Sequence, residues 1–274
     1  MNTGKTIPAS EIILPVHTGD QIPEKDILKY VKNQKSERAF GIFGFETCYR
    51  VFQKEHFIKM LSENKNTLVH VSKWEDPYEA FLLKTKLINA DKQELDLNNL
   101  YKDIYGQCWS LNQHETDATW RIYSPEKNGV LVKTTIGKLW DGFYDLNNPF
   151  AHISFAIGKV TYHNENDLLS EFRGKDLTEI ISRNMEPAIR TLFMKRKEFA
   201  HENEIRIIFN DSNSYAQDGL YKYDIVTQDL IESVVADPRM NDYDYKCLEQ
   251  IVQSYNIEIK KSTLYQLPPS LLTW

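Results

Sequence analysis

The chain has 274 residues, of which 41% are hydrophobic and 26% charged, a balance typical of a globular protein with ample material for a core. Its net charge of −6 argues against a dedicated duplex-DNA-binding protein, which would carry a basic excess. Three widely separated cysteines, Cys48, Cys108 and Cys247, fit neither a disulfide framework nor a zinc-ligand spacing, so we expect a reducing, cytoplasmic setting.

The first 44 residues are predicted to form an N-terminal leader and a helix. Pro8, Pro15 and Pro23 interrupt helix formation early in this segment, and residues 24–31 then show helical apolar spacing. The N-terminus lacks the apolar core of a signal peptide. No apolar run approaches the roughly 18 residues of a membrane span, so we expect no membrane partner.

Short apolar strands and amphipathic helices alternate along residues 45–274. The predicted strands are 48–52, 67–72, 105–111, 130–134, 158–162, 205–209, 221–226, 231–236, 257–260 and 262–267. The predicted helices are 54–63, 78–88, a turn at 120–123, a short one within 135–152, most of 167–202, and 241–255. Because strands and helices are interleaved without a linker or repeat, we predict a single α+β domain over 45–274.

A row of charges stands at the mouth of the predicted strand 205–209. The period of two places Glu202, Glu204 and Arg206 on one face of the chain, with isoleucines on the other. Charged side chains at such a junction destabilise the fold unless water solvates them or they serve in a functional site. Two interpretations stay open, a solvated edge with an ion pair and an active site. The preceding basic run, residues 194–201, is predicted to be a helix with a solvated face.

Several short blocks follow one another in a definite order. They are Tyr49-Arg50, Glu75-Asp76-Pro77-Tyr78-Glu79, Cys108-Trp109-Ser110, Trp120-Arg121-Ile122-Tyr123, Gly129-Val130, Lys195 or Lys197, and Glu202-Asn203-Glu204-Ile205-Arg206. This order resembles a bacterial family of unknown function, number twenty-nine seventy-one, across roughly residues 45 to 265. Glu75 departs from the family pattern, which usually has Asn there. The family name implies no activity.

Arg50, Ser110 and the pair Glu202 and Glu204 also occur in the order of the three signatures of ADP-ribosyltransferases. This more distant resemblance implies an ADP-ribosyltransferase-like split mixed or antiparallel sheet flanked by helices, with NAD as substrate. It implies that Arg50 clamps the NAD pyrophosphate and that Ser110 contacts the nicotinamide ribose. Tyr49, beside Arg50, joins this predicted NAD-binding set.

The same resemblance assigns catalytic roles to the two glutamates. Glu204 would stabilise the oxocarbenium-like charge as nicotinamide leaves, and Glu202 would activate the acceptor. Tyr123 or Trp120 would stack on nicotinamide, and Arg206 would serve as a structural counter-ion. The implied function is an ADP-ribosyltransferase or NAD glycohydrolase, as a bacterial toxin or phage-defence effector. Its acceptor could be a protein, a nucleic acid or water.

Two other functions fit the same residues. In a metal-dependent nuclease, carboxylates and a lysine would gather around Mg²⁺; the candidates are Asp76, Glu79, Glu202, Glu204 and Lys197. In a binding module without catalysis, the aromatic residues would recognise a nucleotide or a partner. Asp76 has a favoured structural interpretation as a helix N-cap. The seven histidines show no ligand spacing, so we expect no zinc site.

Overall fold

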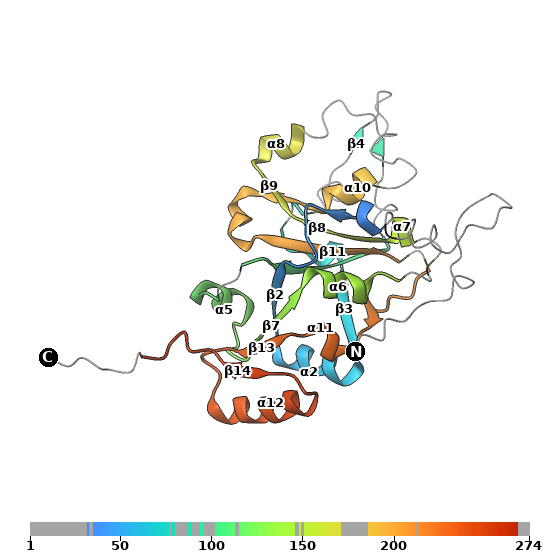
Figure 1. Ribbon diagram of the computed structural model, residues 1–274. Coiled ribbons are helices and arrows are strands. Elements are labelled where there is room, and N and C mark those ends of the chain that lie inside the picture. The colour runs from blue at the N-terminus through green and yellow to red at the C-terminus, as the bar shows by residue number, and fades with distance from the viewer. Residues whose placement is uncertain are drawn as a thin grey trace. The chain divides into compact units, whose positions relative to one another are not determined.

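The computed structural model describes residues 32, 35–76, 78–79, 87–88, 94–95, 102–112, 115–145, 148, 151–170, 186–211 and 213–267. The chain forms two compact units, each assembled from three separated stretches. Figure 1 labels many of the helices and strands that these units contain. The first unit comprises Met1–Ile42, Leu68–Cys108 and Phe143–Tyr221, and the second comprises Phe43–Thr67, Trp109–Gly142 and Lys222–Trp274. The single domain over residues 45–274 and the leader over 1–44 stay predictions.

The first unit is built around β11 (Glu204–Asn210), in which six of seven residues are buried. On one side, β11 pairs antiparallel with β8 (Phe155–Lys159), and β8 pairs in parallel with β1 (Ala39–Phe40). On the other side lies β6 (Ile104–Ser110), which pairs antiparallel with β3 (Lys65–His70) through Val69 and Gly106. This mixed sheet, together with the helices, confirms the predicted α+β class.

An aromatic core lies against the sheet of the first unit. The rings of Phe143 and Phe155 have centroids 4.8 Å apart, and Phe155 lies equally close to Phe209. Phe209 then contacts Tyr221 at 4.1 Å. Because Phe155 and Phe209 come from the paired strands β8 and β11, their packing reinforces the register of these strands.

Shorter elements complete the first unit. They are η2 (Val71–Lys73), β4 (Leu87–Ile88), β5 (Glu94–Leu95), α7 (Ala151–Ser154), β9 (Thr161–His163), α8 (Glu165–Ser170), α10 (Glu186–Thr191), β10 (Met194–Arg196) and η3 (Lys197–Glu202). β9 and β10 form a separate parallel pair in which Tyr162 lies opposite Lys195. β12 (Leu220–Asp224) begins at the end of this unit.

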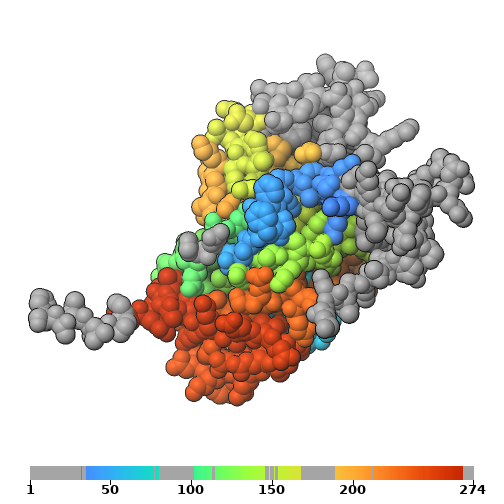
Figure 2. Space-filling model, viewed as in Figure 1, coloured from blue at the N-terminus to red at the C-terminus, as the bar shows by residue number. Residues whose placement is uncertain are grey.

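The second unit contains a four-stranded path, β2–β7–β13–β14. β2 (Thr47–Phe52) and β13 (Ser233–Ala236) both pair antiparallel with β7 (Val130–Thr135), and β14 (Ile259–Lys261) runs parallel to β13. The helices are α2 (Lys54–Glu63), α5 (Asp117–Tyr123), α6 (Ile136–Phe143), α11 (Thr227–Leu230) and α12 (Asp242–Ser254). α12 belongs to the orange-to-red C-terminal surface visible in Figure 2, and it buries Leu248 and Val252.

The basic run after residue 193 differs from its prediction. We predicted a helix over 194–201, whereas the chain forms the strand β10 and then the 3₁₀ helix η3. Pairing with β9 stabilises the extended conformation of residues 194–196, so tertiary contacts override local helix propensity. The predicted helical tract 167–202 survives as α8 and α10, and residues 171–185 lie outside the described part.

Other predictions differ at their ends. Leu87 and Ile88, predicted to end a helix, form β4, and the preceding residues 80–86 lie outside the described part, as does the predicted helix 24–31. Residues 262–267, predicted as a strand, contain a turn instead. No helix in the described part of the chain has the length and apolar character that a membrane span needs.

Candidate active site

Glu202 and Glu204 meet at the junction of two elements, because Glu202 ends η3 and Glu204 begins β11. Asn203 between them adopts a left-handed conformation with φ 44° and ends η3, where its N–H donates to Ala200 O at 3.3 Å. Asparagine tolerates this conformation better than most residues. The two glutamates therefore flank a sharp turn of the chain, and both carboxylates contact the same lysine.

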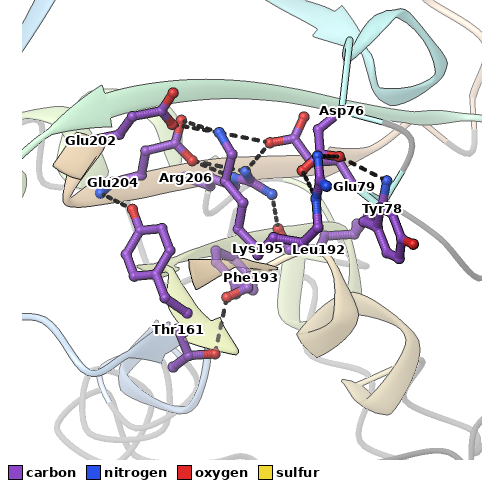
Figure 3. A network of polar contacts seen from close by, with 12 residues as sticks. Asp76, Tyr78, Glu79, Thr161, Leu192, Phe193, Lys195, Glu202, Glu204 and Arg206 are labelled. Atoms are coloured by element: carbon purple, nitrogen blue, oxygen red, sulfur yellow. Dashed lines mark hydrogen bonds and ion pairs between the residues drawn. The ribbon is translucent and has the colours of Figure 1, made fainter. Parts of the chain in front are cut away.

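That lysine is Lys195, which reaches in from β10. Its Nζ lies 2.5 Å from Glu202 Oε2, 3.0 Å from Glu79 Oε1 and 3.5 Å from Glu204 Oε1 (Figure 3). An ammonium group has three N–H donors and no acceptor. Lys195 thus has one donor for each of three carboxylates.

Arg206 holds Glu204 from a second direction. Its Nε and Nη2 donate to Glu204 Oε2 at 3.1 and 2.8 Å, and Nη2 also donates to Glu79 Oε1 at 2.5 Å. Nη1 donates to the carbonyl of Leu192 at 2.7 Å, and the guanidinium stacks 4.5 Å from the ring of Trp74. The side chain has no exposed surface. These contacts confirm the predicted role of Arg206 as a structural counter-ion.

We call Glu79, Lys195, Glu202, Glu204 and Arg206 the glutamate cluster. Its three carboxylates face two cations, so full ionisation leaves one excess negative charge. All five side chains are at most 13% exposed. Since water screens these charges little, each one depends strongly on its neighbours.

The two glutamates respond to this environment in opposite directions. Burial raises the pKa of Glu202, and the nearby charge of Glu204 adds to this, although Lys195 opposes it. Burial would also raise the pKa of Glu204, but Arg206 and Lys195 outweigh burial and hold that pKa below its ordinary value. For Lys195, burial is outweighed by Glu204, Glu202 and Glu79, which raise its pKa. At neutral pH, Glu204 and Lys195 are therefore charged.

Tyr162 lies at the edge of the glutamate cluster. Its hydroxyl oxygen accepts the backbone N–H of Glu204 at 2.8 Å. Burial raises the pKa of Tyr162 to about 12, with a contribution from the carboxylates of Glu204 and Glu202. The phenol is therefore neutral and fixes the start of β11.

A second ion pair lies next to the cluster. Arg196 donates to both oxygens of Asp76, at 3.0 Å from Nη2 and 3.4 Å from Nε. The Arg196 guanidinium also lies 4.6 Å from the Tyr78 ring and 5.2 Å from the Phe199 ring. Asp76 Oδ1 accepts the N–H of Tyr78 at 3.0 Å, at a turn of the chain. The interpretation of Asp76 as a helix N-cap stays a prediction, because most of that predicted helix lies outside the described part.

The magnesium site of the nuclease alternative would involve the same acids, but the structure pairs them with cations. Glu79, Glu202 and Glu204 contact Lys195, and Asp76 contacts Arg196. Within the described residues, no group of three or more histidine, cysteine, aspartate or glutamate side chains could hold a metal ion. The carboxylates are therefore oriented by cations of the protein itself.

The sequence predictions missed the part played by Lys195. We predicted a solvated helix face at 195–197, which is wrong for Lys195, because this residue is only 5% exposed. Lys197, the lysine assigned to the nuclease alternative, is exposed on η3. The one sequence signal for a lysine here was the family block, which Lys195 and Lys197 matched equally well.

The predicted NAD-binding residues lie in the second unit. Tyr49 of β2 and Ser110 of β6 lie opposite each other as register partners, so the structure brings these two together. Arg50 follows Tyr49, and its guanidinium lies 5.2 Å from the Phe52 ring. The roles predicted for these residues stay predictions.

The two aromatic candidates of α5 differ in accessibility. Trp120 is fully buried and donates its indole N–H to Glu115 at 2.9 Å, so its ring has no exposed face for nicotinamide. Tyr123 is 43% exposed, and its backbone carbonyl accepts from the Gln53 side chain. Burial thus removes Trp120 from the stacking candidates, and Tyr123 stays a prediction.

A comparison with protein families agrees with the first predicted resemblance. Residues 119–207, which include the two glutamates and Arg206, match the model of a family described as Protein of unknown function (DUF2971). This match is shorter than the predicted span of 45–265. No curated protein matches the chain.

Solved structures of DarT from Thermus sp. 2.9 are also similar to this chain. The complex with NAD+ has 10% identity and a TM-score of 0.35, covering 80% of this chain and 96% of that one. The complex with ADP-ribosylated single-stranded DNA has 9% identity and a TM-score of 0.35, with coverages of 82% and 97%. The complex with carba-NAD+ has 10% identity and a TM-score of 0.34, with coverages of 80% and 96%.

Proposed function

We propose that the protein is an NAD-consuming enzyme, an ADP-ribosyltransferase or NAD glycohydrolase, in which Glu204 and Glu202 carry the chemistry. The supporting observation is the glutamate pair itself. The two buried carboxylates contact one ammonium group, and their pKa values move in opposite directions. Two titratable groups whose pKa values are pushed apart by their surroundings are typical of an acid–base site.

Glu204 has the properties required to stabilise a cation. Cleavage of the bond between nicotinamide and ribose develops positive charge on the ribose, while nicotinamide leaves as a neutral molecule. An ionised carboxylate fixed beside that charge lowers the barrier, and does so more strongly in a site shielded from water. Arg206 and Lys195 keep Glu204 ionised and hold its oxygens in place.

Glu202 has the properties required of a base for the acceptor. A carboxylate with a raised pKa accepts a proton more readily at neutral pH than an ordinary glutamate. It would take the proton from an acceptor hydroxyl or amine, or from water, as the new bond to ribose forms. Water as acceptor gives a glycohydrolase, and a protein or nucleic acid gives a transferase. Because the chain resembles ADP-ribosyltransferases, we also propose that the enzyme acts as a bacterial toxin or a phage-defence effector.

Nicotinamide release tests the proposal directly. Purified protein is incubated with NAD, with and without cell lysate, and Glu204→Gln is compared with wild type. We expect the variant to release nicotinamide about 100-fold or more slowly, because an uncharged amide cannot stabilise the ribosyl cation. Glu198→Gln, an exposed glutamate on η3, is the matched control and should retain wild-type release. No release above background by wild type, or equal release by wild type and Glu204→Gln, would refute the proposal.

A further inference from the structure

Lys195 occupies a position unusual for a lysine. Its side chain is 7% exposed, and its ammonium group lies within 3.5 Å of carboxylate oxygens from three glutamates. Two of these glutamates, Glu202 and Glu204, are the proposed reactive pair. The third, Glu79, comes from a distant part of the chain. The ammonium group therefore ties the proposed reactive pair to the rest of the first unit.

The backbone and surroundings of Lys195 restrict its motion. Its strand, β10, pairs in parallel with β9, where Tyr162 is the register partner of Lys195. The N–H of Thr161 in β9 donates to the carbonyl of Phe193 at 2.8 Å, at the start of this pairing. The ring of Phe199 lies 4.6 Å from the ammonium nitrogen. A lysine side chain is flexible in water, but this one is fixed by strand pairing, an aromatic ring and three carboxylates.

The two cations of the cluster have different contacts. Arg206 contacts Glu204 and Glu79 and also binds the Leu192 carbonyl, so it anchors one glutamate of the pair to the protein interior. Lys195 contacts both glutamates of the pair. Two carboxylates this close repel each other when both are charged, and a cation shared by both offsets that repulsion.

We propose that Lys195 is a positioning residue, whose ammonium group holds the Glu202 and Glu204 carboxylates next to each other so that both can face one substrate. This inference rests on the function proposed above. Lys195 itself need not touch the substrate, because its ammonium group already forms ion pairs with three glutamates. Its effect on the reaction passes through the orientation and ionisation of the pair, on which Glu79, Arg206 and Tyr162 also act.

Direct titration of the glutamates tests this role without NAD. The side-chain carboxyl carbons of Glu202 and Glu204 are followed by ¹³C NMR against pH in wild type, Lys195→Met and Lys195→Arg, with Glu→Gln variants for assignment. Removing the ammonium group should raise both pKa values by about one unit or more, since a nearby positive charge favours the ionised carboxylate. Lys195→Arg keeps the charge and should restore most of the shift. Unchanged titration of both glutamates in Lys195→Met would overturn the inference.

Enzyme kinetics provide a second test of the positioning role of Lys195. We expect Lys195→Met to lower kcat for nicotinamide release about 100-fold, as expected for misplaced reactive groups, with KM changed less than about threefold. The acidic limb of the pH–rate profile should move to higher pH, and Lys195→Arg should recover part of the rate. Lys197→Met, an exposed lysine on η3, is the matched control and should behave as wild type. Wild-type kcat in Lys195→Met would overturn the inference.

Loss of a buried cation could also unfold the protein, and a double variant addresses this. Lys195→Met with Glu202→Gln removes one charge of each sign, so the cluster keeps its overall charge. Compared with Glu202→Gln alone, the double variant should still show a raised pKa at Glu204, and an unchanged Glu204 titration would overturn the inference. If wild type releases no nicotinamide while Lys195→Met shifts both titrations, the proposed function fails and the positioning role stands.

Discussion

Arg206 shows at the scale of one residue why the glutamate cluster is stable. A fully buried guanidinium is costly unless its donors are satisfied. Here the donors meet two carboxylates and a backbone carbonyl, and the flat face stacks on Trp74. Lysine could not replace this planar fork, because it has a single donor nitrogen. The identity of Arg206 is therefore set by geometry as well as by charge.

The raised pKa of Glu202 predicts the direction in which the stability of the protein changes with pH. Its pKa is raised in the folded state above the ordinary glutamate value of about 4.3. Its contribution to stability is therefore fully present below the unfolded-state pKa and is lost as pH rises through the folded-state pKa. Glu204 has the opposite sign, because its lowered pKa contributes stability above the unfolded-state pKa that is lost on acidification.

We therefore expect Glu202→Gln to gain free energy of unfolding relative to wild type as pH rises from about 4.3, since glutamine has no proton to lose. Urea denaturation of both proteins at a series of pH values measures this difference. Glu198→Gln, at an exposed position of η3, is the control. The expectation would be contradicted if the free energy of unfolding of Glu202→Gln, relative to wild type, stayed constant or fell as pH rises.

The sequence identified the glutamate pair and Arg206, but it could not reveal their full surroundings. The period of two in a strand placed Glu204 and Arg206 on one face, and the structure joins them. Glu79 and Lys195 join the pair through tertiary contacts that no local pattern encodes. For Trp120, sequence spacing predicted an aromatic side chain beside a polar loop, but only the packed structure shows that its ring is buried.

At the scale of elements, the pairing of β1 with β8 depends on Gly158. Gly158 lies opposite Phe40 in this parallel pair, and a Cβ atom at Gly158 would lie 2.8 Å from Phe40 Cβ and 3.1 Å from Phe40 O. We predicted a strand over residues 158–162, beginning at Gly158. It instead lies inside β8, where the absent side chain lets the strands approach.

Gly158→Ala should therefore destabilise the protein by about 1–3 kcal/mol, the usual cost of overpacking. Thermal and urea unfolding measure the change. Gly142→Ala is the matched control, because a Cβ at this exposed end of α6 would meet nothing within 4 Å. That control should be neutral or more stable by up to about 1 kcal/mol, from helix propensity. Wild-type stability of Gly158→Ala would show that β1 can move away without cost.

Strands that carry β-branched or aromatic apolar residues were predicted well, and elements stabilised by distant partners were not. β2, β7 and β11 appear within a residue or two of their predicted ranges, because each is a short run that contains such residues. β10 has no such signal, since its residues, Met194 to Arg196, are extended only because β9 lies beside them. This explains why the predicted helix there is wrong.

At the scale of the whole molecule, both units are discontinuous in sequence. The family match over residues 119–207 accordingly spans portions of both units rather than one whole unit. The stretch Phe143–Tyr221 carries Lys195, Glu202, Glu204 and Arg206. It lacks Glu79, and it also lacks β6, the neighbour of β11.

We expect an isolated fragment of residues 143–221 to remain unfolded, because β11 would lose one neighbouring strand and Arg206 one of its two carboxylates. Circular dichroism and amide NMR dispersion, measured beside the intact chain, test this. A cooperative unfolding transition in the fragment would show that this stretch folds without the earlier part of the first unit.

The residues of the glutamate cluster lie far apart in the sequence, and this has a consequence during translation. Glu79 leaves the ribosome early, whereas Lys195 and the pair at the start of β11 are synthesised much later. A nascent chain that ends before β11 contains no reactive pair, however much of it has already folded. If the protein consumes NAD as proposed, chains that terminate before β11 lack that activity.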